Sequence, residues 1–421
     1  MASLQAALLK RSARKNAERD GHAVLRLVGD GADTQFPLTY IRTGPRGGVP
    51  VLIVPGGPGL ASVVPYQRLR RRAERDGLDV LMVEHRGVGL SRLDEHGNDL
   101  PSEGITIDKV VDDLAAVLDH AGVERAIVYG SSYGTYLAQG LGVRYPDRVA
   151  GMILDSPMLS VEEDIEAARA YRRGLFLEGT DRDLEPVSEA VRTALARGVP
   201  AEEISVVVQI AYEYAGPEIL RQLLTQRSNG RSRSIWTKVA TAGSAEIDGR
   251  GAPFYYEPDL VSRIAFRELG YGLPPDGELL DPQAMFVALA ARHPHFVAEP
   301  FDFPSQISSF SWPTAVISGG RDLRTPRPIA EKIVDLVPNA VLVPITDMGH
   351  SALDSHQLAA VYVTKMMADN KSGSLVGMER YIAGLPHRGA ANLMRRAITG
   401  AVLLGRSTAA VASRLPSRAR S

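Results

Sequence analysis

The run Gly130-Ser131-Ser132-Tyr133-Gly134 contains the residues most suited to nucleophilic chemistry. It directly follows the apolar run Ala126–Tyr129 and opens a helical pattern from Ser132 to about Arg144. A strand, a tight glycine-flanked turn and a helix are the context of a nucleophile elbow, in which the turn raises the central serine hydroxyl above the sheet. The pattern therefore predicts Ser132 as the nucleophile. Ser131 is the competing serine, but it lies off the centre of the motif.

A serine nucleophile needs a base, and the base needs an acid that orients it. Asp322 follows the apolar run Thr314–Ser318, and His350 follows the apolar run Ala340–Pro344. Both positions are expected at the carboxyl ends of strands, where α/β sheets place their sites. Asp155, at the end of an earlier strand, is the alternative acid. Weaker competitors lie near His350 in the sequence: Asp347, Asp354 and His356.

The negative charge that develops on the attacked carbonyl oxygen requires two hydrogen-bond donors. The backbone N–H of Tyr133 is expected to be one donor, because it follows the nucleophile at a helix N-terminus. The second is expected from the loop PGGPG at 55–59, where glycine allows close backbone approach to a ligand. This loop is not a phosphate-binding loop, because it lacks the GxxxxGK[ST] pattern and has no lysine.

The elements around these residues predict an α/β fold. Short apolar runs of strand length, typical of strands buried on both faces, alternate with helical patterns. Such alternation favours a mostly parallel sheet with helices on both faces. The expected strands are 22–28, 37–42, 49–54, 78–83, 126–129, 149–154, 314–318 and 340–344, and the expected core helices are 106–121, 132–144 and 354–367.

Residues 157–308 interrupt this alternation, because they carry helical periodicities and few strand signals. We therefore expect one core over 21–156 and 309–370, with a helical cap over 157–308 inserted into it. Residues 1–20 form an N-terminal extension, expected to be a surface helix or a frayed end. Residues 371–421 form a basic C-terminal extension.

Five motifs together resemble the proline iminopeptidase and tripeptidyl aminopeptidase branch of the α/β-hydrolase superfamily: PGGPG at 55–59, EHRGVGLS at 84–91, GSSYG at 130–134, and the downstream GGRD and GH. The usual motifs of that branch are HGGPG, DQRGxGxS and GxSxG. The resemblance implies an α/β-hydrolase core in which Ser132 attacks a carbonyl, His350 shuttles the proton and Asp322 orients the histidine. It also implies that the N–H groups of Gly57 and Tyr133 bind the oxyanion.

The resemblance implies a serine peptidase that releases N-terminal residues from short peptides through an acyl-enzyme. Two departures concern the surroundings of the site: Pro55 replaces the histidine of the family, and Glu84-His85 replaces Asp-Gln. Aminopeptidases of this branch bind the substrate ammonium with acids of the cap. Glu268, beside Tyr271, is the candidate for this role, with Glu213 second.

The same triad serves ester hydrolysis, so a carboxylesterase or lipase-like enzyme is the alternative. A non-catalytic hydrolase-fold protein that binds a ligand is the alternative of another class. The expected substrate is a small peptide or ester. No cofactor and no metal are needed for this chemistry.

Composition limits the other possibilities. The 421 residues include no cysteine, which excludes disulfides, thiolate metal sites and a cysteine nucleophile. The net charge of −1 gives no support to nucleic-acid binding. No window approaches 18 consecutive apolar residues, and the basic residues of the N-terminus follow its short apolar stretch, the reverse of a signal peptide. A cytoplasmic location agrees with these features.

The charge is unevenly distributed along the chain. Residues 371–421 contain nine Lys or Arg residues and one acid, Glu379, which leaves −9 for residues 1–370. Asn392–Leu404 mixes apolar and basic residues as an amphipathic helix does. We expect the extension either to fold loosely on the acidic body or to contact a membrane surface or a partner protein.

Overall fold

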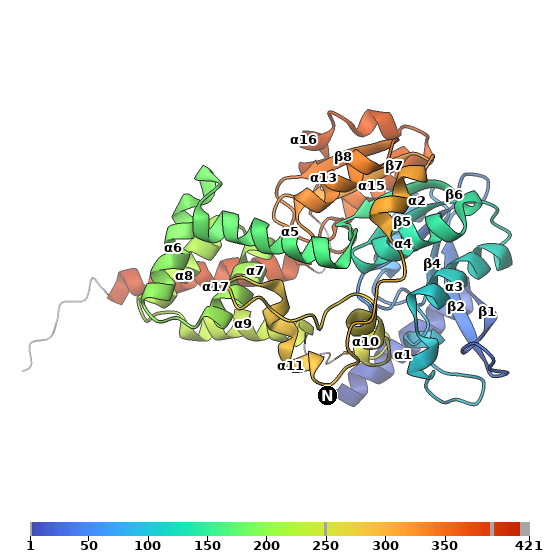
Figure 1. The fold of residues 1–421 in the computed structure, drawn as a ribbon, viewed down its shortest axis with the longest axis horizontal. Coiled ribbons are helices and arrows are strands. Elements are labelled where there is room, and N and C mark those ends of the chain that lie inside the picture. Colours follow the sequence, from blue (N-terminus) through green and yellow to red (C-terminus); the bar gives the residue numbers. More distant parts are fainter. Residues whose placement is uncertain (1, 248–250, 388–390, 413–421) are drawn as a thin grey trace, which may run out of the picture.

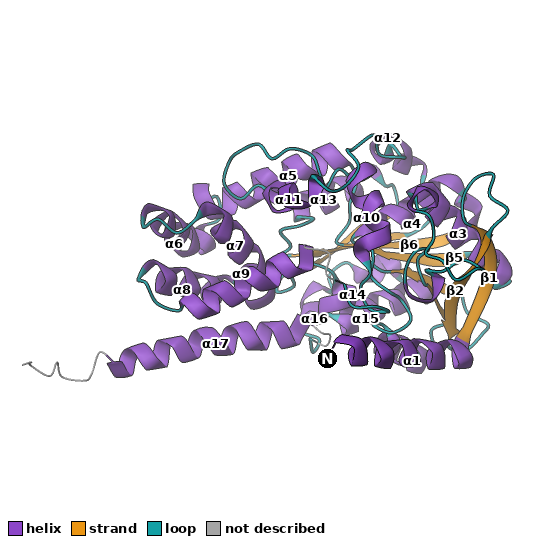
Figure 2. Cartoon of the chain, turned by 90° about the horizontal axis from the view of Figure 1, so that it is seen from below, coloured by secondary structure: helices purple, strands orange, loops and turns teal. Residues whose placement is uncertain are grey.

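The computed structural model describes residues 2–247, 251–387 and 391–412. These residues form an eight-stranded sheet in the order β1-β2-β4-β3-β5-β6-β7-β8. Figure 1 labels most of its strands, and Figure 2 draws the strands in orange. β2 pairs antiparallel with β1 and β4, and all other neighbours are parallel. The strands are β1 (Gly21–Leu27), β2 (Gln35–Thr43), β3 (Val51–Val54), β4 (Val80–Val83), β5 (Ala126–Ser131), β6 (Val149–Asp155), β7 (Thr314–Gly319) and β8 (Ala340–Ile345). The predicted mostly parallel sheet is confirmed.

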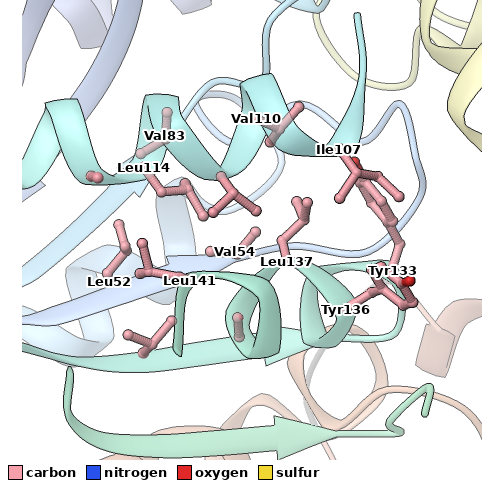
Figure 3. Close-up of a cluster of buried hydrophobic side chains, with 14 of the residues drawn as sticks. Leu52, Val54, Val83, Ile107, Val110, Leu114, Tyr133, Tyr136, Leu137 and Leu141 are labelled. Atoms are coloured by element: carbon pink, nitrogen blue, oxygen red, sulfur yellow. The ribbon is translucent and has the colours of Figure 1, made fainter. Parts of the chain in front are cut away.

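Helices cover both faces of the sheet. Alternate residues of β3 enter different clusters, with Leu52 and Val54 on one face and Val51 and Ile53 on the other, because successive side chains of a strand point to opposite faces. On the first face lie α3 (Ile107–His120), α4 (Tyr133–Arg144) and α13 (Arg327–Leu336). Figure 3 shows Leu137 and Leu141 of α4 packed between this face and Leu114 of α3. On the second face lie α2 (Gln67–Arg75), α15 (Gln357–Ala368) and α16 (Glu379–Ala383).

The chain between β6 and β7 is helical, as expected. Four of its helices share a separate hydrophobic cluster that includes Phe176, Leu220 and Trp236, and Figure 1 shows them in a lobe beside the sheet. The first helix of this insertion, Val161–Arg173, continues into a π-helical turn, Gly174–Glu178. The helices of this insertion are α5 (Val161–Arg173), α6 (Glu185–Ala196), α7 (Ala201–Ala215), α8 (Pro217–Ser228), α9 (Arg233–Ile247), α10 (Pro258–Arg267), α11 (Val287–Ala290) and α12 (Phe303–Gln306).

The described part of the C-terminal extension is not a loose tail, and this corrects one of the two expectations. Its helix α17 (Ala391–Ala412) contacts α7, and Figure 2 shows it running along one side of the helical lobe. Ile398 and Val402 are buried in the cluster of the insertion, since they lie four residues apart on one face of the helix. Residues 388–390 and 413–421 lie outside the described residues. Membrane or partner contact by the extension stays a prediction.

The N-terminal extension is a helix, α1 (Ala2–Asp20), that packs on β2. Ala13 is fully buried beside Ile41, and Asn16 accepts a hydrogen bond from the Gln67 amide at 2.5 Å. The helix α14 (Ala352–Ser355) follows the loop after β8, at the end of the sheet where the expected site lies. None of the described helices is long and apolar enough to cross a lipid bilayer.

Candidate active site

Ser132 occupies a strained turn between β5 and α4. Its φ of 52° and ψ of −122° are unusual for a residue with a side chain, and such strain occurs where the surrounding structure enforces it. Its N–H donates to the carbonyl oxygen of Asp155 at 2.8 Å. The glycines of the motif are required by close packing: a Cβ on Gly134 would overlap the carbonyl oxygen of Val54, and one on Gly130 would overlap the carbonyl of Gly134.

The structure distinguishes the two adjacent serines. Ser131 is fully buried, and its hydroxyl lies 2.8 Å from that of Ser351. Ser132 instead lines a cavity that His350 also lines. Of these two serines, Ser132 is therefore the one that reaches the cavity.

Asp322 and His350 meet at the carboxyl ends of β7 and β8. The His350 Nδ1 lies 2.9 Å from the Asp322 Oδ2, and Asp322 also accepts hydrogen bonds from the Thr325 N–H and hydroxyl, each at 3.0 Å. Burial acts to raise the pKa of Asp322, but the charge and hydrogen bond of His350 and the donors of Thr325 lower it to about 2. Burial acts to lower the pKa of His350, but Asp322 raises it overall above its usual value.

The alternative acid, Asp155, has a different role. Its carboxylate accepts hydrogen bonds from the N–H groups of Ala352 and Leu353, both at 2.9 Å, and from the Tyr129 hydroxyl at 3.0 Å. Asp155 therefore fixes the start of α14, directly after His350, rather than orienting the imidazole. Sequence spacing alone did not separate these two roles.

The loop after β3 passes over the nucleophile. A Cβ on Gly56 would lie 3.2 Å from the Cβ of Ser132, and Gly56, Gly57 and Pro58 all line the same cavity. Gly57 has a φ of 128°, a conformation that favours glycine. The loop is thus close enough to Ser132 for a backbone N–H to reach an atom bonded to the serine.

The motif EHRGVGLS holds the segment that directly follows this loop. The buried Glu84 carboxylate accepts hydrogen bonds from the N–H groups of Ser62 and Val63, at 2.5 and 3.1 Å. Burial raises the pKa of Glu84 to about 7, although these backbone donors lower it. Gly89 lies so close to Glu84 that a Cβ there would overlap the carboxylate. The sequence did not indicate this supporting role of Glu84.

The two departures from the family motifs meet in space. Pro55 and His85 both line a small cavity of 20 Å³ beside Tyr133. The His85 Nε2 lies 3.1 Å from the Tyr133 hydroxyl, and its Nδ1 lies 2.6 Å from the carbonyl oxygen of Arg86. Burial lowers the pKa of His85 to about 4, so it is neutral at pH 7. The imidazole therefore acts as an uncharged hydrogen-bonding group behind the elbow.

The two glutamates predicted to bind an ammonium are both engaged by protein groups, and ammonium binding by either stays a prediction. Glu268 does not line the cavity; its carboxylate accepts a hydrogen bond from the Ile107 N–H at the start of α3, at 2.8 Å. Glu213 is buried and binds the Leu323 N–H at 3.2 Å and the Arg324 Nε at 3.1 Å. Both carboxylates hold protein groups in position.

The cavity at Ser132 has a volume of 1610 Å³ and receives walls from the core, the insertion and α17. Its apolar walls include Val161 and Ile165 of α5 and Phe286. Eight arginines line it but only three aspartates. Four of the arginines belong to α2, namely Arg68, Arg71, Arg72 and Arg75, and the others are Arg172, Arg292, Arg324 and Arg396. The side chains that line the cavity therefore carry more positive than negative charge, which the net charge of −1 for the whole chain did not indicate.

The three cavity aspartates are all engaged by protein groups. Asp164 accepts a hydrogen bond from the Leu159 N–H at 2.7 Å, and burial raises its pKa to about 8. Asp259 forms an ion pair with Arg92 at 2.7 Å. Asp354 accepts a hydrogen bond from the Tyr66 hydroxyl at 2.6 Å. Across the described ranges, no three His, Asp or Glu side chains gather in a way that could hold a metal ion.

The chain is similar in sequence or in structure to several known proteins. Residues 49–197 match the family model described as alpha/beta hydrolase fold. The chain is 24% identical to a probable proline iminopeptidase of Leptolyngbya boryana, over 77% of this chain and 88% of that protein. It is 23% identical to a rhodomycin D methylesterase of Streptomyces sp. (strain C5), over 72% of this chain and 85% of that protein. A solved proline iminopeptidase of Mycobacterium smegmatis superposes with a TM-score of 0.46 and 18% identity, over 84% of this chain and 99% of the other.

Proposed function

The chain has the alpha/beta hydrolase fold and is similar to proline iminopeptidases, and from this premise we propose that it is a serine hydrolase working through an acyl-enzyme. One observation carries the proposal: Ser132 at the strained elbow opens into the same cavity as His350, whose other ring nitrogen lies 2.9 Å from Asp322. A nucleophile, a base and an orienting acid in this arrangement are the parts that acyl transfer requires.

In the proposed mechanism, the Ser132 Oγ attacks the substrate carbonyl carbon while the His350 Nε2 accepts its proton. The imidazolium then donates that proton to the leaving group. A water molecule next attacks the acyl carbon while His350 accepts its proton, and this proton passes to the Ser132 Oγ as the acyl group is released. Asp322, with its pKa near 2, remains ionised and stabilises the imidazolium through Nδ1. We assign the oxyanion contacts to the backbone N–H groups of Gly57 and Tyr133.

The insertion over 157–308 is proposed to act as a cap. Residues of α5 and α10 contribute to the walls of the cavity that contains Ser132, so a substrate has to fit between these helices and the core. Such an enclosure admits small molecules and short peptides and excludes folded proteins.

Two bond types remain candidates within this proposal. Release of N-terminal residues from short peptides is supported by the names of relatives such as the Leptolyngbya protein. Ester hydrolysis is supported by the cavity itself, because its three aspartates are already bound by protein groups and its glutamate candidates face elsewhere. A substrate ammonium would have to compete for those carboxylates, whereas an ester makes no such demand.

A substrate panel separates these candidates. Wild-type protein is assayed with free-amine and N-blocked aminoacyl nitroanilides, and with short-chain nitrophenyl esters. Turnover of free-amine substrates alone supports the aminopeptidase, and turnover of esters alone supports the esterase. Ser132→Ala is expected to lose all turnover, while Ser131→Ala serves as the matched control. If no substrate is turned over and the wild type binds them as Ser132→Ala does, the protein is a ligand-binding protein and the proposal fails.

A further inference from the structure

Arg172 is a buried guanidinium at the wall of the cavity. It lies on α5 with 4% of its surface exposed. Its Nε donates to the carbonyl oxygen of Leu323 at 2.7 Å, and its Nη2 donates to the Gln209 side-chain oxygen at 2.8 Å. Because Leu323 directly follows Asp322, these bonds tie Arg172 to the loop that carries the orienting acid. Its position relative to the triad is therefore fixed.

Among the described residues, Arg172 forms no direct ion pair, although the charges of Glu213, Asp322 and Asp281 act on it. Within the described ranges its Nη1 donates to no protein acceptor. The carboxylate with the largest electrostatic effect on it, that of Glu213, is already bound to Arg324. Burial lowers the pKa of Arg172 only to about 10, so it remains charged at neutral pH. A buried charge without a partner is costly, which favours an anion that arrives with the substrate.

The surroundings favour the same ligand. Arg324 follows Leu323 and lines the cavity beside His350, and the arginines of α2 line another part of it. A cavity with apolar walls and a surplus of cations concentrates anions and accelerates their entry. A guanidinium held by two hydrogen bonds is also well suited to recognise a carboxylate through its remaining N–H groups.

We propose that Arg172 binds a carboxylate group of the substrate, so that the hydrolase prefers anionic esters or peptides over neutral ones. This proposal rests on the proposed hydrolase function and names its substrate class. The carboxylate belongs either to the acyl part, as in a dicarboxylic monoester, or to the leaving part, as in the C-terminus of a dipeptide. Either group would be held near His350 while Ser132 attacks the carbonyl, and Arg172 takes no part in bond breaking.

The first experiment compares matched substrates that differ in one charge. On the acyl side, p-nitrophenyl hydrogen glutarate is compared with its neutral methyl ester; on the leaving side, a dipeptide is compared with its C-terminal amide. For wild-type protein we expect the charged member of one pair to have a kcat/KM higher by roughly tenfold to a hundredfold, the range of one charged hydrogen bond. The pair that shows this preference identifies which side carries the carboxylate.

The second experiment removes the charge. Arg172→Gln is expected to lose most of the preference for the charged substrate, measured as the ratio of kcat/KM between the charged and the neutral member of the pair. Arg173→Gln is the matched control, because Arg173 binds the Leu279 carbonyl and Asp276 in a similar way but does not line the cavity. Arg173→Gln is expected to keep the full preference.

A measurement on wild-type protein covers the case in which Arg172→Gln does not fold. Glutarate is expected to inhibit hydrolysis of the neutral ester competitively, at concentrations at least roughly tenfold below those of the neutral glutaramide. If neutral substrates are turned over but charged ones have no advantage and glutarate does not inhibit, the inference is wrong while the hydrolase function stands. A preference that survives in Arg172→Gln likewise overturns it. If no ester and no peptide is hydrolysed, the proposed function itself fails.

Discussion

Replacing Asp322 by Asn tests whether this carboxylate controls His350. The side chain is almost completely buried, and its Oδ2 lies 2.9 Å from the His350 Nδ1. Charges about 4 Å apart interact with about 4 kcal/mol at an effective dielectric constant near 20, which corresponds to roughly a thousandfold in rate. Asn also presents an N–H to Nδ1 and so favours the wrong tautomer of the imidazole. We therefore expect kcat/KM to fall by about 10³ to 10⁴.

The pH profile gives a second readout of the same substitution. Catalysis needs neutral His350, so kcat/KM rises with pH through the pKa of this residue. Asp322 raises that pKa above the usual 6.5, so the wild-type midpoint is expected above pH 6.5. Without the carboxylate, burial dominates and the midpoint is expected to move to lower pH.

The control is Asp347→Asn, which lies three residues from His350 but pairs with Arg321 at the surface. It is expected to change kcat/KM by less than about threefold, consistent with the small effect of exposed ion pairs. Circular dichroism establishes that both variants are folded. A loss of less than tenfold in Asp322→Asn, or an unchanged pH midpoint, would refute the assignment of Asp322 as the orienting acid.

Three further predictions concern stability. Gly134→Val places a side chain on the carbonyl oxygen of Val54 and should cost about 3 kcal/mol or more, seen as loss of soluble protein or a lower thermal midpoint. Ile398→Ala should lower the free energy of unfolding in urea by about 2 to 5 kcal/mol, because the Ile398 side chain is only 4% exposed. The control Leu404→Ala, at a position that is 70% exposed, should change it by less than about 0.5 kcal/mol. Equal effects of the two substitutions would show that α17 does not pack as described. Burial lowers the pKa of His356 to about 4, so the folded state favours the neutral imidazole. The free energy of unfolding should therefore fall as the pH drops from about 6.5 toward 4. His356→Gln should flatten this pH dependence, and an unchanged slope contradicts the explanation.

Much of the core was predictable because its signals are local. Each strand predicted from an apolar run is present, with ends that differ by a few residues at most. The elbow was recognisable because strand, glycine turn and helix are contiguous between residues 126 and 144. The pairing of His350 with Asp322 followed from strand ends, since parallel strands bring their carboxyl ends to one edge of the sheet.

The role of Glu268 as an ammonium ligand stays a prediction, since no local pattern tells which way a cap side chain faces. Its carboxylate contacts the N-terminus of α3, 161 residues away in sequence. The expectation that the C-terminal extension packs loosely is contradicted for α17, because its buried apolar residues complete the hydrophobic cluster of the insertion. Both cases concern contacts between segments that are distant along the chain.

The amino-acid sequence by itself determined the sheet, the elbow and the identity of the proposed nucleophile, because short-range periodicity and steric limits on the backbone specify these features. Only the tertiary structure decided the character of the cavity. It brings α2, α5, the loop after β7 and α17 to the same space, and it removes water from Arg172. The strength of a charge depends on its burial and on its neighbours, and both are properties of the packed molecule rather than of any segment of the chain.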